Sequence, residues 1–169
     1  METSRGNQLA REIREKAEAL KKVYQGVDEE LASRAPKDRW TPKQIISHLC
    51  GPDDRGHLPM LKAFLDSNIP KIDLDAGNMF FSEARAGMSF KELVAMCEEN
   101  YRRIAEFAAG LTDEQLARTA HIPELKDSPL GEYPTLDALI GGLGDYHLRF
   151  HIDHLHEILA DSSSTGIAA

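Results

Sequence analysis

The sequence has little cysteine, a shortage of basic charge and no long apolar run, and each shortage excludes a class of protein. Its 169 residues include 28 acidic and 20 basic side chains, a net charge of −8. This charge disfavours a nucleic-acid duplex or an anionic membrane surface as a partner. No stretch approaches the roughly 18 apolar residues of a membrane span. Because Cys50 and Cys97 are the only cysteines and the first segment is polar, we expect a cytoplasmic protein whose partner is a small molecule or another protein.

Strand-like alternation is absent too, and apolar residues instead recur at spacings of three or four, as on amphipathic helices. We expect one domain spanning 1–169, with a folded core of about 7–160 and a flexible tail at 161–169. The helical periods cover four segments: 7–24, 42–68, 90–109 and 135–160. The glycines and prolines of "GPDDRGHLP" interrupt the second segment, so it should form two pieces. The expected fold class is therefore all-α, a four-helix bundle with a broken second helix.

Start signals and one long connection complete this outline. Thr41 and Ser89 each precede a Gln or Glu by three residues, which is the spacing of a capping box. The segment 69–88 has no sustained period and is long for a connection. We expect it to cover the bundle through Phe80 and Phe81.

The stretch "YHLRFHIDHLHEIL", residues 146–159, holds four of the seven histidines of the chain. On a helical wheel of about 100° per residue, counted from Leu136, the core stripe lies within about 60° of that residue. The predicted stripe comprises Leu139, Ile140, Leu143 and Phe150. The same wheel turns His156 to solvent and three histidines to the core: His147, His151 and His154.

His147 and His151 are spaced i, i+4, so both imidazoles can reach one ion about 2.0–2.1 Å from each nitrogen. The best third ligand is His48, which flanks the apolar face of the second helix. The alternative interpretation is that these are core histidines satisfied by hydrogen bonds. His154, one turn on, is either a residue that supports a ligand or a plain packing residue.

Other site motifs fail on the residues present. A zincin helix needs Glu directly after its first His, but "HLRFH" has Leu148 there. A di-iron bundle needs repeated Glu-x-x-His pairs, and the sequence has none. "GGLG" at 141–144 follows no strand and includes no Lys, so it favours close approach of two helices rather than a phosphate loop.

Two motifs resemble the DinB-like superfamily of four-helix bundles: "WTPKQIISHL", 40–49, and "HLRFHIDHL", 147–155. The resemblance extends from Leu9 to about Ala160 and includes the "LTDEQLAR" turn. It implies a divalent metal, zinc or nickel, held by His48, His147 and His151, and it implies a homodimer.

Relatives in that superfamily are described as metal-dependent hydrolases, and related branches are thiol-dependent transferases or isomerases. The resemblance therefore implies metal-dependent hydrolysis or thiol transfer on a small molecule. The alternative is a non-catalytic ligand-binding or stress-response module with a structural metal. The residues do not identify a general base. Since only neutral imidazoles bind metal, affinity should fall below about pH 6.

The sequence departs from the family pattern after His48, where "CGPDDRGHLP" replaces continuous helix. This places Cys50 and Asp53 close to the expected site, with Cys50 on a different side of the helix. Asp53 or Asp54 could act as base or fourth ligand, or simply be a solvated or capping residue. His57 and His121 are lower-ranked ligands that we expect to be exposed. Trp40 is expected to anchor the core.

Overall fold

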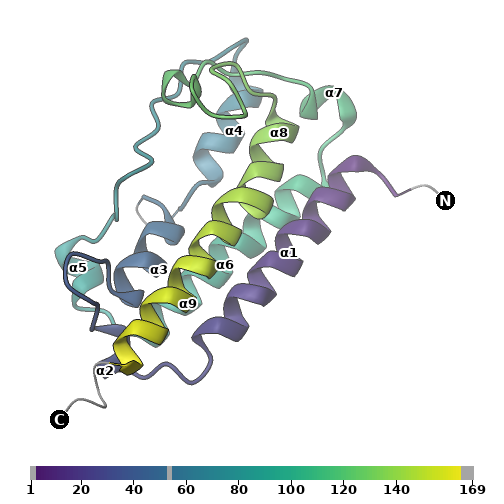
Figure 1. The fold of residues 1–169 in the computed structure, drawn as a ribbon. Coiled ribbons are helices and arrows are strands. Elements are labelled where there is room, and N and C mark those ends of the chain that lie inside the picture. Colours follow the sequence, from purple (N-terminus) through teal and green to yellow (C-terminus); the bar gives the residue numbers. More distant parts are fainter. Residues whose placement is uncertain (1–2, 53–54, 165–169) are drawn as a thin grey trace.

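The computed structural model describes residues 3–52 and 55–164, and these form the predicted all-α bundle (Figure 1). Four helical rods make up the described part of the bundle. They are α1 (Arg5–Tyr24), α3 (Pro42–Cys50) with α4 (Leu58–Asp66), α6 (Phe90–Ala109), and α8 (Leu136–Gly142) with α9 (Arg149–Ser164). A π-helical turn, Leu143–Leu148, joins α8 to α9. None of the described helices is long and apolar enough to cross a membrane.

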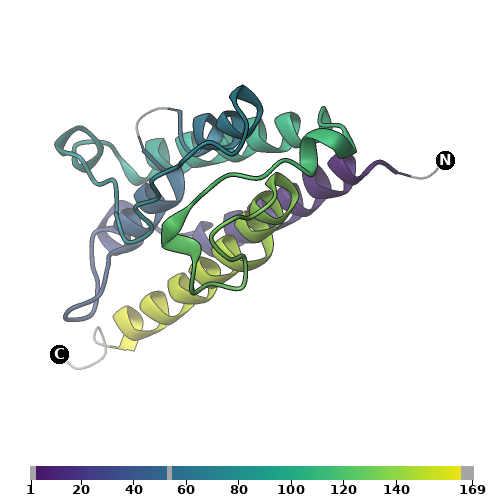
Figure 2. The ribbon, with the colours of Figure 1, turned by 90° about the horizontal axis from the view of Figure 1, so that it is seen from above.

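Short elements lie in the connections between the rods. They are α2 (Glu29–Ala32), α5 (Glu83–Ala86), α7 (Asp113–Leu116) and a 3-10 turn (Pro123–Leu125). The described residues include two isolated β-bridges, Lys71 with His121 and Thr119 with Thr135, and no named strand. The 67–88 segment runs along the outside of the bundle from α4 toward α6, as both Figure 1 and Figure 2 show.

The rods pack in a ring that does not follow their order in the sequence. α1 packs against α6 and against the α8–α9 rod, and α3 packs against α6 and α9. α1 and α3 are therefore diagonal to each other. The arrangement places α3 beside α9 and so brings together residues about 100 positions apart in the chain.

The predicted start signals and the predicted break are confirmed. Thr41 and Gln44 form a reciprocal capping box with Pro42 in the first turn, and Ser89 caps α6 in the same way. Within the second rod, α3 ends at Cys50 because Gly51 adopts a positive φ of 73°, a conformation that glycine adopts without steric cost.

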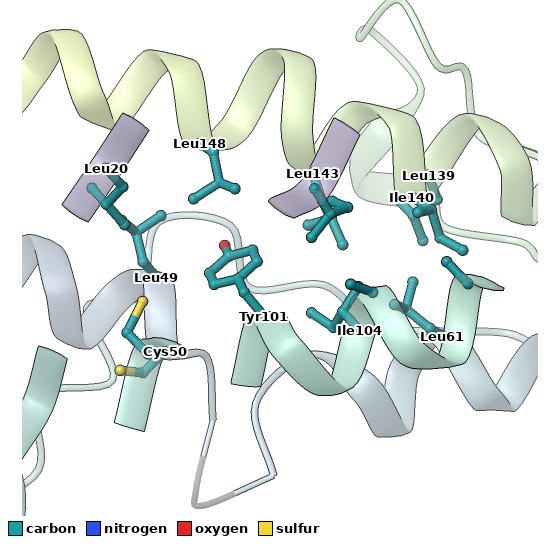
Figure 3. Packing of buried hydrophobic residues seen from close by; sticks show 14 of the residues in the cluster. Leu20, Leu49, Cys50, Leu61, Tyr101, Ile104, Leu139, Ile140, Leu143 and Leu148 are labelled. Carbon is teal, nitrogen blue, oxygen red and sulfur yellow. The ribbon is translucent and has the colours of Figure 1, made fainter. Parts of the chain in front are cut away.

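The aliphatic core lies between α1, α6 and α8. In Figure 3 the side chains of Ile140 and Leu143 point toward Ile104 of α6, and all three residues are at most 7% exposed. The backbones approach closely at Gly6, where an added Cβ would lie 2.4 Å from the Ala108 carbonyl oxygen. The "GGLG" stretch also meets α1, since a Cβ on its last glycine would lie 3.4 Å from Ile13.

The predicted wheel fails in the last rod because of the π turn. A π turn inserts one residue into the helix, so each later residue takes the direction that an α-helix gives to the residue before it. Leu148 moves from about 120° to about 20° from the core direction and is fully buried. Phe150, predicted in the core stripe, moves to about 140° from it and is 56% exposed. Its assignment to the core was wrong.

The end of the same rod also differs from the prediction. α9 continues to Ser164, four residues beyond the predicted end at Ala160, so the predicted flexible tail begins too early. The remaining tail residues, 165–169, lie outside the described part of the chain.

Candidate metal centre

Three imidazoles converge between α3 and the α8–α9 rod. His48 comes from the last turn of α3, His147 from the π turn and His151 from the first turn of α9. One ring nitrogen from each lies within 4.8 Å of the others, and His48 Nε2 is 2.9 Å from His147 Nε2. Two nitrogens bound tetrahedrally to one ion at about 2.0–2.1 Å lie about 3.3 Å apart. The three histidines predicted as ligands are therefore close enough to hold one metal ion.

The π turn helps to build this cluster. The one-residue shift leaves His151 about 40° from the core direction, so it remains buried while Phe150 turns outward. π turns occur mostly as single turns and often at functional sites. The i, i+4 spacing predicted the pair, but its geometry is that of a distorted helix.

The main chain fixes the tautomer of His48. Its Nδ1 lies 2.6 Å from the Asn78 carbonyl oxygen, which only accepts hydrogen bonds, so Nδ1 is the nitrogen that carries the hydrogen. The lone pair of His48 is then on Nε2, the nitrogen that faces His147. Ligating histidines commonly donate their other N–H to a carbonyl in this way.

Burial keeps the cluster neutral. It lowers the pKa of His147 well below the usual value and the pKa of His151 to about 3, with smaller contributions from neighbouring histidines. Burial also lowers the pKa of His48, although the hydrogen bond to Asn78 opposes the shift. Because the imidazoles are already neutral, a metal ion can bind without displacing a proton from them.

If the three histidines were ordinary core residues, hydrogen bonds would satisfy their buried ring nitrogens, and two of these nitrogens are not satisfied. The buried Nδ1 atoms of His147 and His151 have no hydrogen-bond partner among the described residues. A buried polar atom without a partner costs about 1–3 kcal/mol. The convergent ring nitrogens and their neutral state fit a bound divalent ion.

A hollow of about 360 Å³ opens beside the cluster, a volume within the range of small-molecule sites. We call it the imidazole hollow; its lining is Asp38, Arg39, Trp40, His48, Ala76, Phe150, His151 and His154. The Trp40 ring stacks on His151 with centroids 6.4 Å apart. Trp40, which was expected to anchor the core, is half-buried, packs against the core cluster and also forms a wall of this hollow.

Two further predicted residues have clear positions. His154 is half-buried and lines the hollow, and burial lowers its pKa. Cys50 does not belong to the site, since its Sγ lies 3.5 Å from the Leu93 carbonyl oxygen of α6, in the core seen in Figure 3. Because residues two apart lie on different faces of a helix, Cys50 points away from His48, into the core, where it is fully buried. Asp53 and Asp54 lie outside the described residues.

The expectation that His57 and His121 are exposed was wrong. His57 is buried beside His147, with ring centroids 6.1 Å apart, and burial lowers its pKa to about 4. After α3 the chain folds back over Gly51, and this fold-back buries His57. The irregular sequence around His57 gives no sign of that burial. His121 is half-buried and stacks on Tyr133 in the connection before α8.

Comparisons with known proteins identify a fold. No family model and no curated protein matches the sequence. Among solved structures, YfiT from Bacillus subtilis matches with a TM-score of 0.75 and 21% identity, over 94% of this chain and 87% of that chain. This chain has the YfiT fold. YfiT is described as a probable metal-dependent hydrolase with an unusual four-helix bundle topology.

Sequence reasoning missed the Asn78 carbonyl, the stacking of Phe80 on His48, and Arg85, which donates to the Ser47 and Phe80 carbonyls. The aperiodic 69–88 segment and its two phenylalanines were the available signal, and they did predict that the segment docks. The sequence does not show that a carbonyl from this segment meets a histidine ring.

Proposed function

We propose that the chain is a metal-dependent enzyme that binds one divalent ion, zinc or nickel, at His48, His147 and His151. In this proposal it hydrolyses a small molecule held in the imidazole hollow. The carrying observation is that two members of the cluster, His48 and His151, also line that hollow. Structural zinc sites are closed by four protein ligands, whereas catalytic sites have three and an open position.

When bound, such an ion polarises a carbonyl group and lowers the pKa of a bound water or thiol. The walls of the hollow do the positioning. Trp40 and Phe150 offer flat apolar faces that exclude water from a bound substrate. The Arg39 guanidinium is held by Glu157 at 3.0 Å, so its charge is compensated. A neutral small molecule with a flat apolar part fits these walls, and His154 is placed to contact it.

Thiol-dependent transfer is the second candidate, and the lining of the hollow favours it in one respect. Asp38 is the single carboxylate among the described lining residues, and it is exposed. Hydrolysis commonly uses a positioned general base, whereas a thiol acidified by a metal is already an active nucleophile. The hollow therefore supplies little that hydrolysis needs beyond the ion.

The likeness to YfiT supports the proposal, because that protein is described as a probable metal-dependent hydrolase. Membership of the DinB-like superfamily, a homodimer and a cytoplasmic location stay predictions from the sequence. A non-catalytic module with a structural metal is the competing function, and the open side of the cluster counts against it.

Activity of metal-loaded protein tests the proposal. Zinc- or nickel-loaded protein is assayed with p-nitrophenyl acetate and butyrate for hydrolysis, and with 1-chloro-2,4-dinitrobenzene and cysteine for thiol transfer. We expect metal-dependent turnover in one assay and its loss in His48→Ala. The control is His156→Ala, an exposed histidine of α9, the helix that carries His151, and this variant should retain activity. Binding of one ion without turnover in either assay would favour the non-catalytic module.

A further inference from the structure

One short part of the 69–88 segment, residues 78–85, makes direct contact with His48. The Asn78 carbonyl accepts the hydrogen bond from His48 Nδ1 at 2.6 Å. The Phe80 ring stacks on the His48 ring, with centroids 6.3 Å apart and planes 9° apart. We call this part, 78–85, the His48 clamp.

Arg85 ties the clamp to the residue that precedes His48. Its side chain is only 5% exposed. Nη1 donates to the Ser47 carbonyl oxygen at 2.9 Å and to the Phe80 carbonyl oxygen at 3.2 Å. The Ser47 hydroxyl also donates to the Phe80 carbonyl, at 2.9 Å. One buried guanidinium therefore joins α3 and the clamp through main-chain atoms on both sides.

The backbone of the clamp is strained, which shows that its geometry is imposed. Phe80 has a φ of +50°, a region that side-chain-bearing residues seldom occupy. The Asn78 side chain holds it there, because Oδ1 accepts from the Phe80 N–H at 2.7 Å and Nδ2 donates to Asp75 at 2.9 Å. Strain of this kind persists only where the surroundings over-determine it, and it concentrates at functional sites.

We propose that Arg85 is a positioning residue for the metal centre. By fixing the Phe80 carbonyl on Ser47, it holds the Asn78 carbonyl against His48 Nδ1. Which nitrogen of a histidine carries the hydrogen is set by the hydrogen bond that the other makes. Arg85 thereby keeps the lone pair of His48 on Nε2, directed at His147. The effect on metal affinity rests on the proposed function, but the effect on the tautomer does not.

Arg118 provides a matched control, because it makes the same kind of contact elsewhere. Its Nε donates to the Phe64 carbonyl at 2.7 Å and its Nη2 to the Ser67 carbonyl at 2.8 Å. These bonds join the connection after α7 to the end of α4, away from the histidine cluster. Arg118→Met therefore removes an arginine that binds main-chain carbonyls without touching the clamp.

The first readout is the His48 tautomer in metal-free protein, measured by long-range ¹H–¹⁵N correlation on protein labelled at histidine. The parent and Arg118→Met should show the Nδ1–H form. Arg85→Met should show the other tautomer or exchange between the two, and Arg85→Lys should restore part of the signal. The Nδ1–H form unchanged in Arg85→Met would overturn the proposal.

The second readout is zinc and nickel affinity by calorimetry. We expect a loss of about 10- to 100-fold in Arg85→Met, the range for residues that orient a ligand, and no loss in Arg118→Met. If Arg85→Met does not fold, Ser47→Ala is the substitute, because it removes the hydroxyl that bonds to Phe80 and Arg85. It should shift the His48 tautomer in the same direction. If the parent binds no metal, the proposed function fails while the tautomer still decides the role of Arg85.

Discussion

Between α1, α6 and α8 most buried side chains are aliphatic, whereas the junction of α3 with the α8–α9 rod also holds a cluster of imidazoles beside its aliphatic residues. In the first region the Tyr101 hydroxyl is buried without a described partner. In the second, four nitrogens are in that position: His57 Nε2 and the Nδ1 atoms of His147, His151 and His154. Burying an aliphatic side chain stabilises a fold by about 1.5–3 kcal/mol, whereas an unpaired polar atom costs about 1–3 kcal/mol. The aliphatic region stabilises the bundle, whereas the unpaired nitrogens of the imidazole cluster carry a cost, as is common at functional sites.

The largest stability effect should come from the aliphatic region. Ile104 is 1% exposed and packs between α6 and α8, so Ile104→Ala should lower the free energy of unfolding by about 2–5 kcal/mol. Urea unfolding measures the loss. Calorimetry on the folded variant should show zinc affinity equal to that of the parent. A tenfold loss of affinity would show that the two regions are coupled and would break the comparison.

Acid should destabilise the metal-free protein through the histidine region. Burial lowers the pKa of His57 to about 4 in the folded state, against about 6.5 in the unfolded chain. Above pH 6.5 both states are neutral, and as pH falls toward 4 the unfolded state gains a proton that the folded state rejects. His57 alone should remove about 3 kcal/mol of stability over this window.

The measurement is the free energy of unfolding against pH in the presence of a chelator. His57→Leu should reduce the slope by one proton relative to the parent between pH 6.5 and 4. Equal slopes in the two proteins would mean that His57 is not buried as the structure has it.

Replacing an imidazole by an aliphatic side chain should stabilise the metal-free protein. His151 is 6% exposed and its Nδ1 has no described partner. His151→Leu removes that unpaired atom, so we expect a gain of about 1 kcal/mol in the free energy of unfolding. The exposed control, His156→Leu, should stay within about 0.5 kcal/mol of the parent. A loss of 1 kcal/mol or more in His151→Leu would show that the imidazole stabilises the apo fold.

The smallest expected effect is the pH dependence of metal affinity. Three ordinary imidazoles would lose about 600-fold in affinity between pH 7 and 5.5. Here burial lowers the pKa of all three proposed ligands, so the loss should be less than about tenfold. This moves the fall predicted from the sequence, below about pH 6, to more acidic pH. A zinc titration at both pH values that shows a hundredfold loss would contradict the geometry.

The sequence predicted the features that are local. Capping at Thr41 and Ser89, the break after Cys50 and the i, i+4 pair of His147 and His151 all depend on residues a few positions apart. The wheel also selected the right side of the last helix up to Gly142.

The sequence could not predict features set by packing. The π turn has no marker in "LGDYHL"; it rotates Leu148 and Leu155 into the core, and this gain depends on neighbouring helices. The burial of His57 follows from a fold-back over glycines with positive φ. Arg85 meets Ser47 across 38 positions, a contact with no local signal.

Metal content tests the central claim most directly. Untagged protein is loaded with zinc or nickel, freed of excess metal and analysed for elements, beside His48→Ala, the double variant His147→Ala, His151→Ala, and the control His156→Ala. The account predicts about one ion per chain in the parent and in the control, and none in the other two. No metal in the parent after loading, or equal metal in all four proteins, would contradict a metal centre at the three histidines.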